Sequence, residues 1–325
     1  MRTFGFTAPT SVRSALDRSS DSSAYLAGGT TLVDLMKLGV LAPRRVVDIN
    51  RLPLHGISRD ERGLRIGALE RMGDVAAHPL VRTHYPVISQ ALDLSASPQL
   101  RNMASIGGNL LQRTRCGYFR DVTTPCNKRE PGSGCSALHG ENRIHAILGT
   151  SDSCVATHPS DLAVALTALD AVLSLRGPDG ERSVPLREFY RLPGTTPHIE
   201  NVLKPAELIT GVTVPPLAWA RRSSYLKIRD RQSYEFALAS AAVALRLDGD
   251  TVVEARIAVG GVGTRPWRLP EVERALAGRP RTAATFEEAA ALADDGARPL
   301  THNAYKTTLV RRTVQRALTE LGGAR

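Results

Sequence analysis

The chain has 325 residues, of which 42% are apolar and 5% aromatic, and its formal net charge is +10. This length exceeds one ordinary hydrophobic core, so we expect two or three domains. The longest apolar run, residues 162–175, is too short for a membrane span and contains Asp170, so no transmembrane helix is predicted. The N-terminus lacks an apolar h-region, so we expect no signal peptide.

The excess positive charge is spread along the chain. The arginines form no long block, and no zinc-finger, RNP or helix-turn-helix pattern is present, so we expect no nucleic-acid partner. Scattered surface arginines are the simplest explanation of the charge. An acidic protein partner or a bound phosphate group fits the pattern better than nucleic acid does.

The first 54 residues alternate between helix and strand. In order, we expect a helix from residue 9, a short strand over 24–29 that ends in a double glycine, a helix over 30–39 and a strand over 44–49. A strand, a glycine-rich turn and a helix in this order favour phosphate binding. The reason is that the first turn of a helix offers free N–H groups and the positive end of the dipole.

Residues 55–218 form the second predicted unit. In order, we expect a strand pair and a helix (56–81), a second helix (85–102), the segment ASIGGNLLQ (104–112), a long cysteine segment, a helix and a hairpin turning at GPDG (158–190), and a strand (207–216). The prolines after this last strand suit a boundary near residue 218.

The last third of the chain, residues 219–325, is expected to be an α+β domain. It begins with a strand, followed by a small-residue segment that suits either a helix or a strand. A hairpin turning at residues 248–250 and Ala-rich helices complete it.

Two segments carry paired glycines beside small polar residues: LAGGTTL (26–32) and ASIGGN (104–109). Glycine lets the backbone approach a ligand closely and adopt positive φ. We interpret both as a strand followed by a glycine turn, and two such turns could hold a pyrophosphate from both sides. Neither segment matches GxGxxG or GxxxxGK[ST], which disfavours a Rossmann site and a P-loop. Ordinary tight turns are the alternative.

A third candidate is HPSDLAVAL (158–166). Ser160 and Asp161 stand where a helix N-cap belongs, so a purely structural cap is one interpretation. The other is that the carboxylate of Asp161 binds the hydroxyls of a ribityl chain or a ribose.

All four cysteines lie within 39 residues, with the spacing C-x9-C-x8-C-x18-C. Disulfides rarely cluster in one segment of a large domain, a structural zinc site usually has a C-x2–4-C pair, and inert thiols would be scattered. Four thiolates could instead hold an iron–sulfur cluster, and five cationic side chains could offset their charge: Arg115, Arg120, Lys128, Arg129 and Arg143. The spacing favours the cluster and leaves the other three explanations open.

Three histidines fall near the cysteines: His139, His145 and His158. Since four cysteines complete a ligand set, we expect these histidines at the surface or in hydrogen bonds. Tyr118 and Phe119 are expected to pack around the cluster.

Taken together, these motifs resemble the FAD-binding medium subunit of the xanthine dehydrogenase family of molybdenum hydroxylases. The match covers essentially the whole chain through LAGGTTLVDLMK, RNMASIGGNLLQ, HPSDLAVAL and YLKIRDRQSYEFALASAAVAL. The cysteine insert, at about 113–156, is similar to a branch whose FAD subunit carries an extra 4Fe-4S cluster. Bacterial periplasmic aldehyde oxidoreductases and 4-hydroxybenzoyl-CoA reductases belong to that branch.

The resemblance implies an α+β fold with a two-lobed FAD-binding domain of the vanillyl-alcohol-oxidase/PCMH type, lobes 1–54 and 55–218, followed by a C-terminal α+β domain at 219–325. It also implies site residues. The implied FAD-binding residues are Leu26, Ala27, Gly28, Gly29, Thr30, Thr31, Leu32, Ser105, Gly107, Gly108, Asn109, Gln112, Asp161, Ile209 and Lys227. The implied cluster ligands are Cys116, Cys126, Cys135 and Cys154.

The resemblance further implies a role in electron transfer within a heterotrimer. A molybdopterin-binding large subunit and a small subunit with 2Fe-2S clusters would oxidise an aldehyde, and this chain would pass the electrons through FAD and a 4Fe-4S cluster to an external acceptor. A 4-hydroxybenzoyl-CoA reductase-like or xanthine dehydrogenase-like complex is the alternative. The compartment would be the cytoplasm, or the periplasm by export together with a partner.

Overall fold

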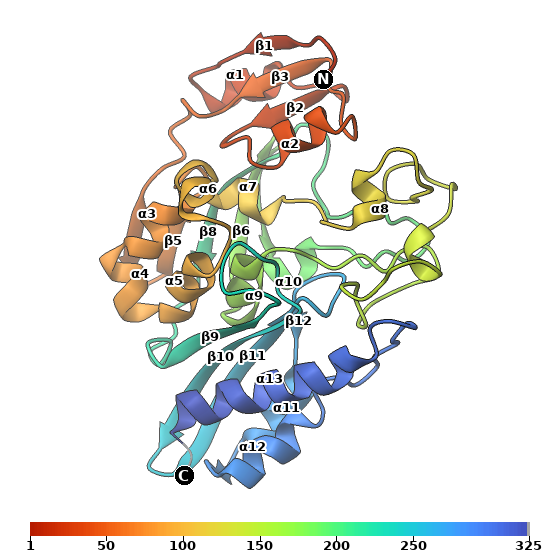
Figure 1. Ribbon diagram of the computed structural model, residues 1–325. Helices are drawn as coiled ribbons and strands as arrows, with labels where there is room; N and C mark the ends of the chain where they lie inside the picture. The colour runs from red at the N-terminus through yellow and green to blue at the C-terminus, as the bar shows by residue number, and fades with distance from the viewer. Residues whose placement is uncertain (324–325) are drawn as a thin grey trace.

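The N-terminal part of the chain forms a small parallel sheet at the top of Figure 1. The computed structural model describes residues 1–323. β3 lies between β1 and β2 and pairs in parallel with both. Helix α1 packs Ala15 and Leu16 against Val47 of β3. The elements are β1 (Gly5–Thr7), α1 (Val12–Asp17), β2 (Ser23–Leu26), α2 (Leu32–Lys37) and β3 (Arg45–Asp48).

The middle of the molecule is an antiparallel sheet with the strand order β4-β5-β8-β6-β7. Its strands are β4 (Ile57–Asp60), β5 (Gly63–Gly67), β6 (Val172–Gly177), β7 (Gly180–Pro185) and β8 (Leu208–Val214). Its helices are α3 (Met72–Ala77), α4 (Pro79–His84), α5 (Pro86–Asp93), α6 (Pro98–Met103), α7 (Ile106–Leu110), α9 (Asp161–Ala168) and α10 (Leu186–Phe189). All eight residues of α9 are buried, because the helix contacts α5 on one side and strands β10 and β11 of the next sheet on the other.

The cysteine segment runs between α7 and α9 and extends to the right in Figure 1. It contains only short helices, α8 (Gly117–Arg120) and the 3-10 turn η1 (Ser136–Leu138). Its two ends are tied together, since the hydroxyl of Thr114 donates to the carbonyl of Thr157 at 3.1 Å.

The C-terminal part is a sheet with the order β12-β11-β10-β9, with β13 also pairing with β11, and α13 lies across it in Figure 1. Its elements are β9 (Ser223–Ile228), β10 (Ala239–Asp248), β11 (Thr251–Gly260), β12 (Trp267–Arg268), α11 (Pro270–Leu276), β13 (Arg279–Pro280), α12 (Ala283–Ala290) and α13 (Tyr305–Gly322). None of the helices in residues 1–323 is long and apolar enough to cross a lipid bilayer.

The small-residue segment left open between helix and strand is strand β10. Its side chains alternate between two cores: Ala242 and Ala244 pack in the core of the middle part, whereas Ala241, Val243 and Leu245 pack in the C-terminal core. Small side chains suit this position because α9 and α13 both contact the strand.

Candidate functional site

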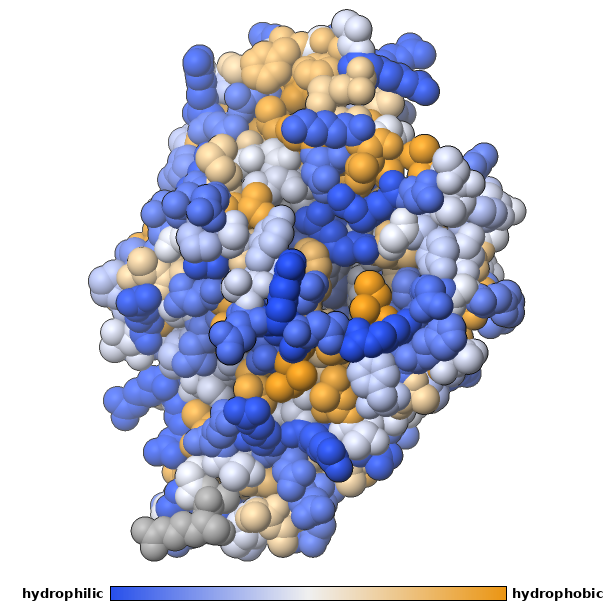
Figure 2. Space-filling view, in the orientation of Figure 1, coloured by the Kyte–Doolittle hydropathy of each residue, from blue (hydrophilic) through white to orange (hydrophobic). Residues whose placement is uncertain are grey.

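A cavity of about 590 Å³ lies where the three parts of the chain meet. Figure 2 shows a hollow in the middle of this face with hydrophilic side chains around it. A cavity of this volume suits a small molecule or a cofactor. The lining residues include Thr30, Thr31 and Asp34 from the N-terminal part, Gly108, Asn109, Gln112 and Asp161 from the middle part, and Lys227, Ser240 and Gly261 from the C-terminal part.

The first glycine segment connects β2 to α2 at the edge of this cavity. Gly29 has φ +73°, a left-handed conformation that favours glycine. A Cβ on Gly28 would lie 1.9 Å from the carbonyl oxygen of Met103, so this segment packs directly on the chain before the second glycine segment. Within residues 1–323, the amides at positions 29–32 donate no hydrogen bond to another backbone group. Free amides at a helix start fit an anionic pyrophosphate.

The second glycine segment is not the strand and glycine turn expected from the sequence. Gly107 and Gly108 lie inside helix α7, which Ser105 caps by accepting from the amide of Gly108 at 3.1 Å. The amide of Gly107 donates to the carbonyl of Ala68 at 2.8 Å. Because these amides already have partners, the prediction that backbone amides of both segments hold a pyrophosphate can apply only to the first segment.

The second segment instead contributes side chains, and a glycine without a side chain, to the wall of the cavity. Asn109 accepts a hydrogen bond at 2.6 Å from Ser160, whose hydroxyl oxygen also caps α9 by accepting from the amide of Ala163 at 3.0 Å. Gly108 and Gln112 line the cavity beside Asn109. Ser160 is therefore the N-cap of α9, as its position in the sequence predicted, and it also lines the cavity.

Asp161 opens α9 and is held by three donors at the cavity wall. Lys227 donates to its carboxylate at 2.8 Å, Tyr225 at 2.7 Å and Ser95 at 3.1 Å. The side chains of Lys227 and Asp161 are 1% and 7% exposed, so this is a buried ion pair. Burial raises the pKa of Tyr225 well above its ordinary value, so its hydroxyl stays a donor.

The cavity brings together only part of the predicted FAD-binding set. Thr30, Thr31, Gly108, Asn109, Gln112, Asp161 and Lys227 line it. Ile209 is buried in β8 opposite Leu175 and is not among the lining residues. Also outside the lining, in or beside the two glycine segments, are Leu26, Ala27, Gly28, Gly29, Leu32, Ser105 and Gly107.

All four cysteines line a second, small cavity of about 10 Å³. Cys126 and Cys135 face each other across an isolated antiparallel bridge, and Cys116 also lines the large cavity. The four thiols are free, so the disulfide explanation is wrong. Within residues 1–323, no group of three or more Cys, His, Asp or Glu side chains is arranged to hold a single metal ion.

The donor chemistry of the small cavity suits an iron–sulfur cluster. A cubane has four irons that each take one thiolate, so its ligand sulfurs lie farther apart than those around one ion. A cubane is also larger than a cavity of about 10 Å³, so the segments around the four cysteines would have to lie farther apart when a cluster is bound. Burial raises the pKa of Cys116 to about 12 and that of Cys154 above its ordinary value, and Lys128 opposes the rise at Cys154. A bound metal would have to displace these thiol protons.

The five cationic side chains near the cysteines form ion pairs or hydrogen bonds with other protein groups. Arg120 and Arg115 both bind Asp34 of α2, at 2.8 and 3.1 Å, and the hydrogen bond from Arg120 is the main reason that the pKa of Asp34 is lowered. Arg143 pairs with Asp230 at 2.8 Å, and Arg129 donates to the carbonyls of α8. These contacts anchor the cysteine segment to the N-terminal and C-terminal parts.

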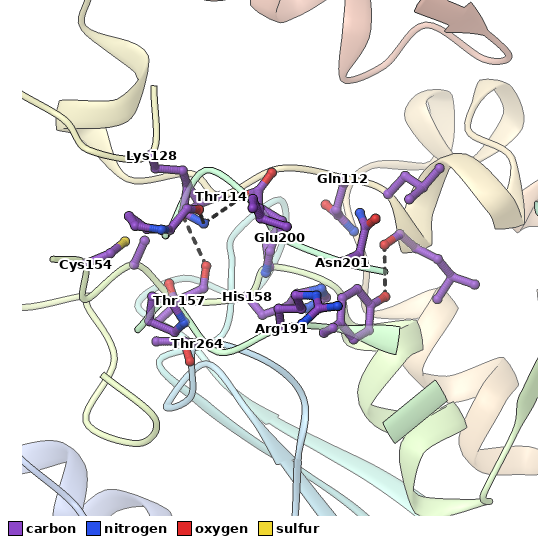
Figure 3. A pocket seen from close by; sticks show the side chains of 18 residues that line it. Gln112, Thr114, Lys128, Cys154, Thr157, His158, Arg191, Glu200, Asn201 and Thr264 are labelled. Atoms are coloured by element: carbon purple, nitrogen blue, oxygen red, sulfur yellow. Dashed lines mark hydrogen bonds and ion pairs between the residues drawn. The ribbon is translucent and has the colours of Figure 1, made fainter. Parts of the chain in front are cut away.

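Glu200 was not singled out from the sequence. In Figure 3 it faces Lys128, and Cys154 lies to one side. Lys128 binds it at 2.9 Å and Arg113 at 2.6 Å. Burial works against ionisation of Glu200, but the two cations hold its pKa below the usual range. An acidic side chain 46 residues after Cys154 gives no local signal, so only the fold could reveal this pairing.

His139 is exposed at the end of η1, whereas the other two histidines near the cysteines are more enclosed. His145 is buried, and its Nε2 lies 3.2 Å from the sulfur of Cys116. His158 packs edge-on against Tyr190, with ring centroids 4.4 Å apart, and burial lowers its pKa to about 3. Phe119 packs in one apolar group with Cys116, Cys126 and Cys154, and Tyr118 packs against that group.

Comparison with known families identifies the class of protein. Residues 2–217 match the FAD binding domain in molybdopterin dehydrogenase, and residues 224–321 match the CO dehydrogenase flavoprotein C-terminal domain. The chain therefore belongs to the FAD-binding subunits of the molybdenum hydroxylase family, whose complexes are oxidoreductases. The α+β fold class expected from the sequence is confirmed.

Individual relatives cover nearly the same length. The chain is 48% identical to the aldehyde oxidoreductase FAD-binding subunit of Escherichia coli, over 91% of this chain and 90% of that protein. It is 30% identical to the glyceraldehyde dehydrogenase medium chain of Sulfolobus acidocaldarius, over 80% of this chain and 75% of the relative. Among solved structures, carbon monoxide dehydrogenase from Hydrogenophaga pseudoflava, lacking the Mo-pyranopterin moiety of the molybdenum cofactor, superposes with a TM-score of 0.75 at 28% identity. The match covers 98% of this chain and 96% of that one.

Proposed function

We propose that this chain is the electron-transfer subunit of a molybdenum-dependent aldehyde oxidoreductase complex, and that it carries FAD and a 4Fe-4S cluster. Electrons would come from a molybdopterin-binding large subunit and a 2Fe-2S small subunit and leave to an external acceptor. The observation that carries the proposal is that Cys116 lies in the walls of both cavities, so the two cofactors would be neighbours.

The large cavity supports FAD as its ligand. The amides at positions 29–32 would receive the pyrophosphate, and Gly108, Asn109 and Gln112 would form the opposite wall. The Asp161–Lys227 pair would face the sugar hydroxyls and the flavin edge. FAD supplies the redox chemistry, and these residues bind and orient it.

The small cavity supports the cluster, with Cys116, Cys126, Cys135 and Cys154 as ligands. Four free thiols from one segment are the donor set that such clusters require. The aldehyde assignment is supported by the names of two relatives, an aldehyde oxidoreductase subunit and a glyceraldehyde dehydrogenase chain.

The test is co-expression of the full chain with the two partner subunits, followed by anaerobic purification. We expect FAD, molybdenum and cluster iron in the complex, and aldehyde-dependent reduction of an acceptor dye. Cys135→Ser should lower the iron and sulfide content by one 4Fe-4S cluster while FAD is retained, since Cys135 lies outside the large cavity. Ser136→Ala, at the next residue, should leave the iron content unchanged. A chain that purifies alone, or iron content unaffected by Cys135→Ser, would contradict the proposal.

The lobe limits 1–54, 55–218 and 219–325 and the compartment are part of the same proposal. Limited proteolysis would test the limits. Fractionation of cells expressing all the subunits would decide between the cytoplasm and export together with a partner.

A further inference from the structure

His145 lies between the two cavities. It is 3% exposed, and its Nε2 is 3.2 Å from the sulfur of Cys116. Both residues line the large cavity, and Cys116 also lines the small one. His145 thus contacts the cysteine that the two cavities share.

The surroundings of the His145 ring decide which nitrogen carries the proton. A neutral imidazole carries its one proton on either Nδ1 or Nε2. Within residues 1–323, the buried Nδ1 has no hydrogen-bond partner. A proton there would be a buried donor without an acceptor. Nε2 faces the Cys116 sulfur, so beside a thiolate ligand, which only accepts, the proton would sit on Nε2 and be donated to that sulfur.

The start of α13 holds the backbone around this ring. The side-chain amide of Asn303 donates to the carbonyls of His145 at 3.2 Å and Ala146 at 3.3 Å. The amine of Lys306 donates to the carbonyl of Ile144 at 2.9 Å. These contacts from the C-terminal part fix the position of the imidazole relative to Cys116.

We infer that His145 is a positioning residue that sets the reduction potential of the cluster by donating its Nε2–H to the Cys116 sulfur. The inference rests on the proposed function, because it requires the cluster. Reduction adds negative charge to a cluster and its ligand sulfurs, and a donor to a sulfur stabilises that charge. Removing the donor should disfavour reduction by about tenfold, which for a one-electron couple is about 59 mV toward more negative potential.

The test is a potentiometric titration of the complete complex, monitored by the EPR signal of the reduced cluster. His145→Phe keeps a ring of similar size without an N–H and should shift the midpoint to more negative potential. His145→Gln restores an N–H near the position of Nε2 and should return the midpoint toward the wild-type value. His139→Phe, in the same segment, is the control and should cause no shift.

A second measurement needs no variant. Wild-type complex labelled with ¹⁵N-histidine should show a weak ¹⁵N coupling to the reduced cluster in pulsed EPR. An unchanged midpoint in His145→Phe, or no coupling in the labelled wild type, would overturn the inference while leaving the cluster in place. A wild-type chain that lacks the cluster iron would instead overturn the proposed function.

Discussion

The two glycine segments look alike in sequence but differ in backbone conformation and in the hydrogen bonds of their amides. In the first, Gly29 is left-handed, and the amides at positions 29–32 donate to no backbone group of the described residues 1–323. In the second, Gly107 and Gly108 are helical, and their amides bind Ala68 and Ser105. Paired glycines therefore indicate that another group packs closely against the backbone. If the backbone amides already donate to other protein groups, that group is the protein itself, and if they are free, it can be a ligand.

The largest expected effect comes from Gly28→Ala. The new methyl would lie 1.9 Å from the carbonyl oxygen of Met103, a backbone atom that cannot turn away. We expect the free energy of unfolding to fall by about 3 kcal/mol or more and the purified protein to lack FAD. Urea unfolding and the flavin content of the purified protein would measure this. Gly5→Ala, whose methyl would meet only the Arg44 carbonyl oxygen at 3.8 Å, is the matched control. Normal FAD content in Gly28→Ala would mean that the two segments can separate without harm.

Ser160→Ala tests whether the second segment acts through its side chains. The change removes the cap of α9 and the donor to Asn109. We expect a loss of about 1–2 kcal/mol of stability and about tenfold weaker FAD binding. Thr282→Ala removes a cap of the same kind from α12, far along the chain, and should lower stability by about 1 kcal/mol without affecting FAD. Equal FAD affinity in the two variants would refute the role of Ser160.

Mild acid should lower the stability of the protein through His158, which contacts Ser160. His158 accepts from the amide of Ser160 at 3.4 Å, and burial lowers its pKa from 6.5 to about 3. Above pH 6.5, neither the folded nor the unfolded chain protonates this ring. Between pH 6.5 and 3 only the unfolded chain does, so stability falls as the pH falls, by at most about 1.4 kcal/mol per pH unit.

Unfolding measurements at pH 7.5 and 5.5 would show the slope, and His158→Phe should make it shallower. An unchanged slope in the variant would show that other groups cause the acid sensitivity.

The smallest effect is expected for Gly108→Ala. Its methyl would meet only the hydroxyl oxygen of Ser105, at 2.9 Å, and alanine favours a helix by about 1 kcal/mol over glycine. Stability should change by less than about 1 kcal/mol. FAD binding should weaken by about fivefold, because the methyl enters the cavity wall. Fluorescence titration with FAD would measure it, and unaltered affinity would mean that the ligand does not reach this wall.

Local signals in the sequence were enough for several features. Thr30 and Thr31 precede a helix, Ser160 caps α9 and the four cysteines share one segment, because each of these depends on neighbours in the chain. The α+β class and the hairpin at residues 248–250 were also predictable, from periodicity and turn residues.

Contacts between distant segments decided the rest. The amide of Gly107 donates to the carbonyl of Ala68, and Lys227 and Tyr225 donate to the carboxylate of Asp161. Lys128 forms an ion pair with Glu200, and His145 contacts the sulfur of Cys116. A sequence shows which side chains can donate or accept, but hydrogen bonds and ion pairs need atoms within about 3 Å. That proximity exists only after the three sheets have packed together, so the residue types came from the sequence and their partners from the tertiary structure.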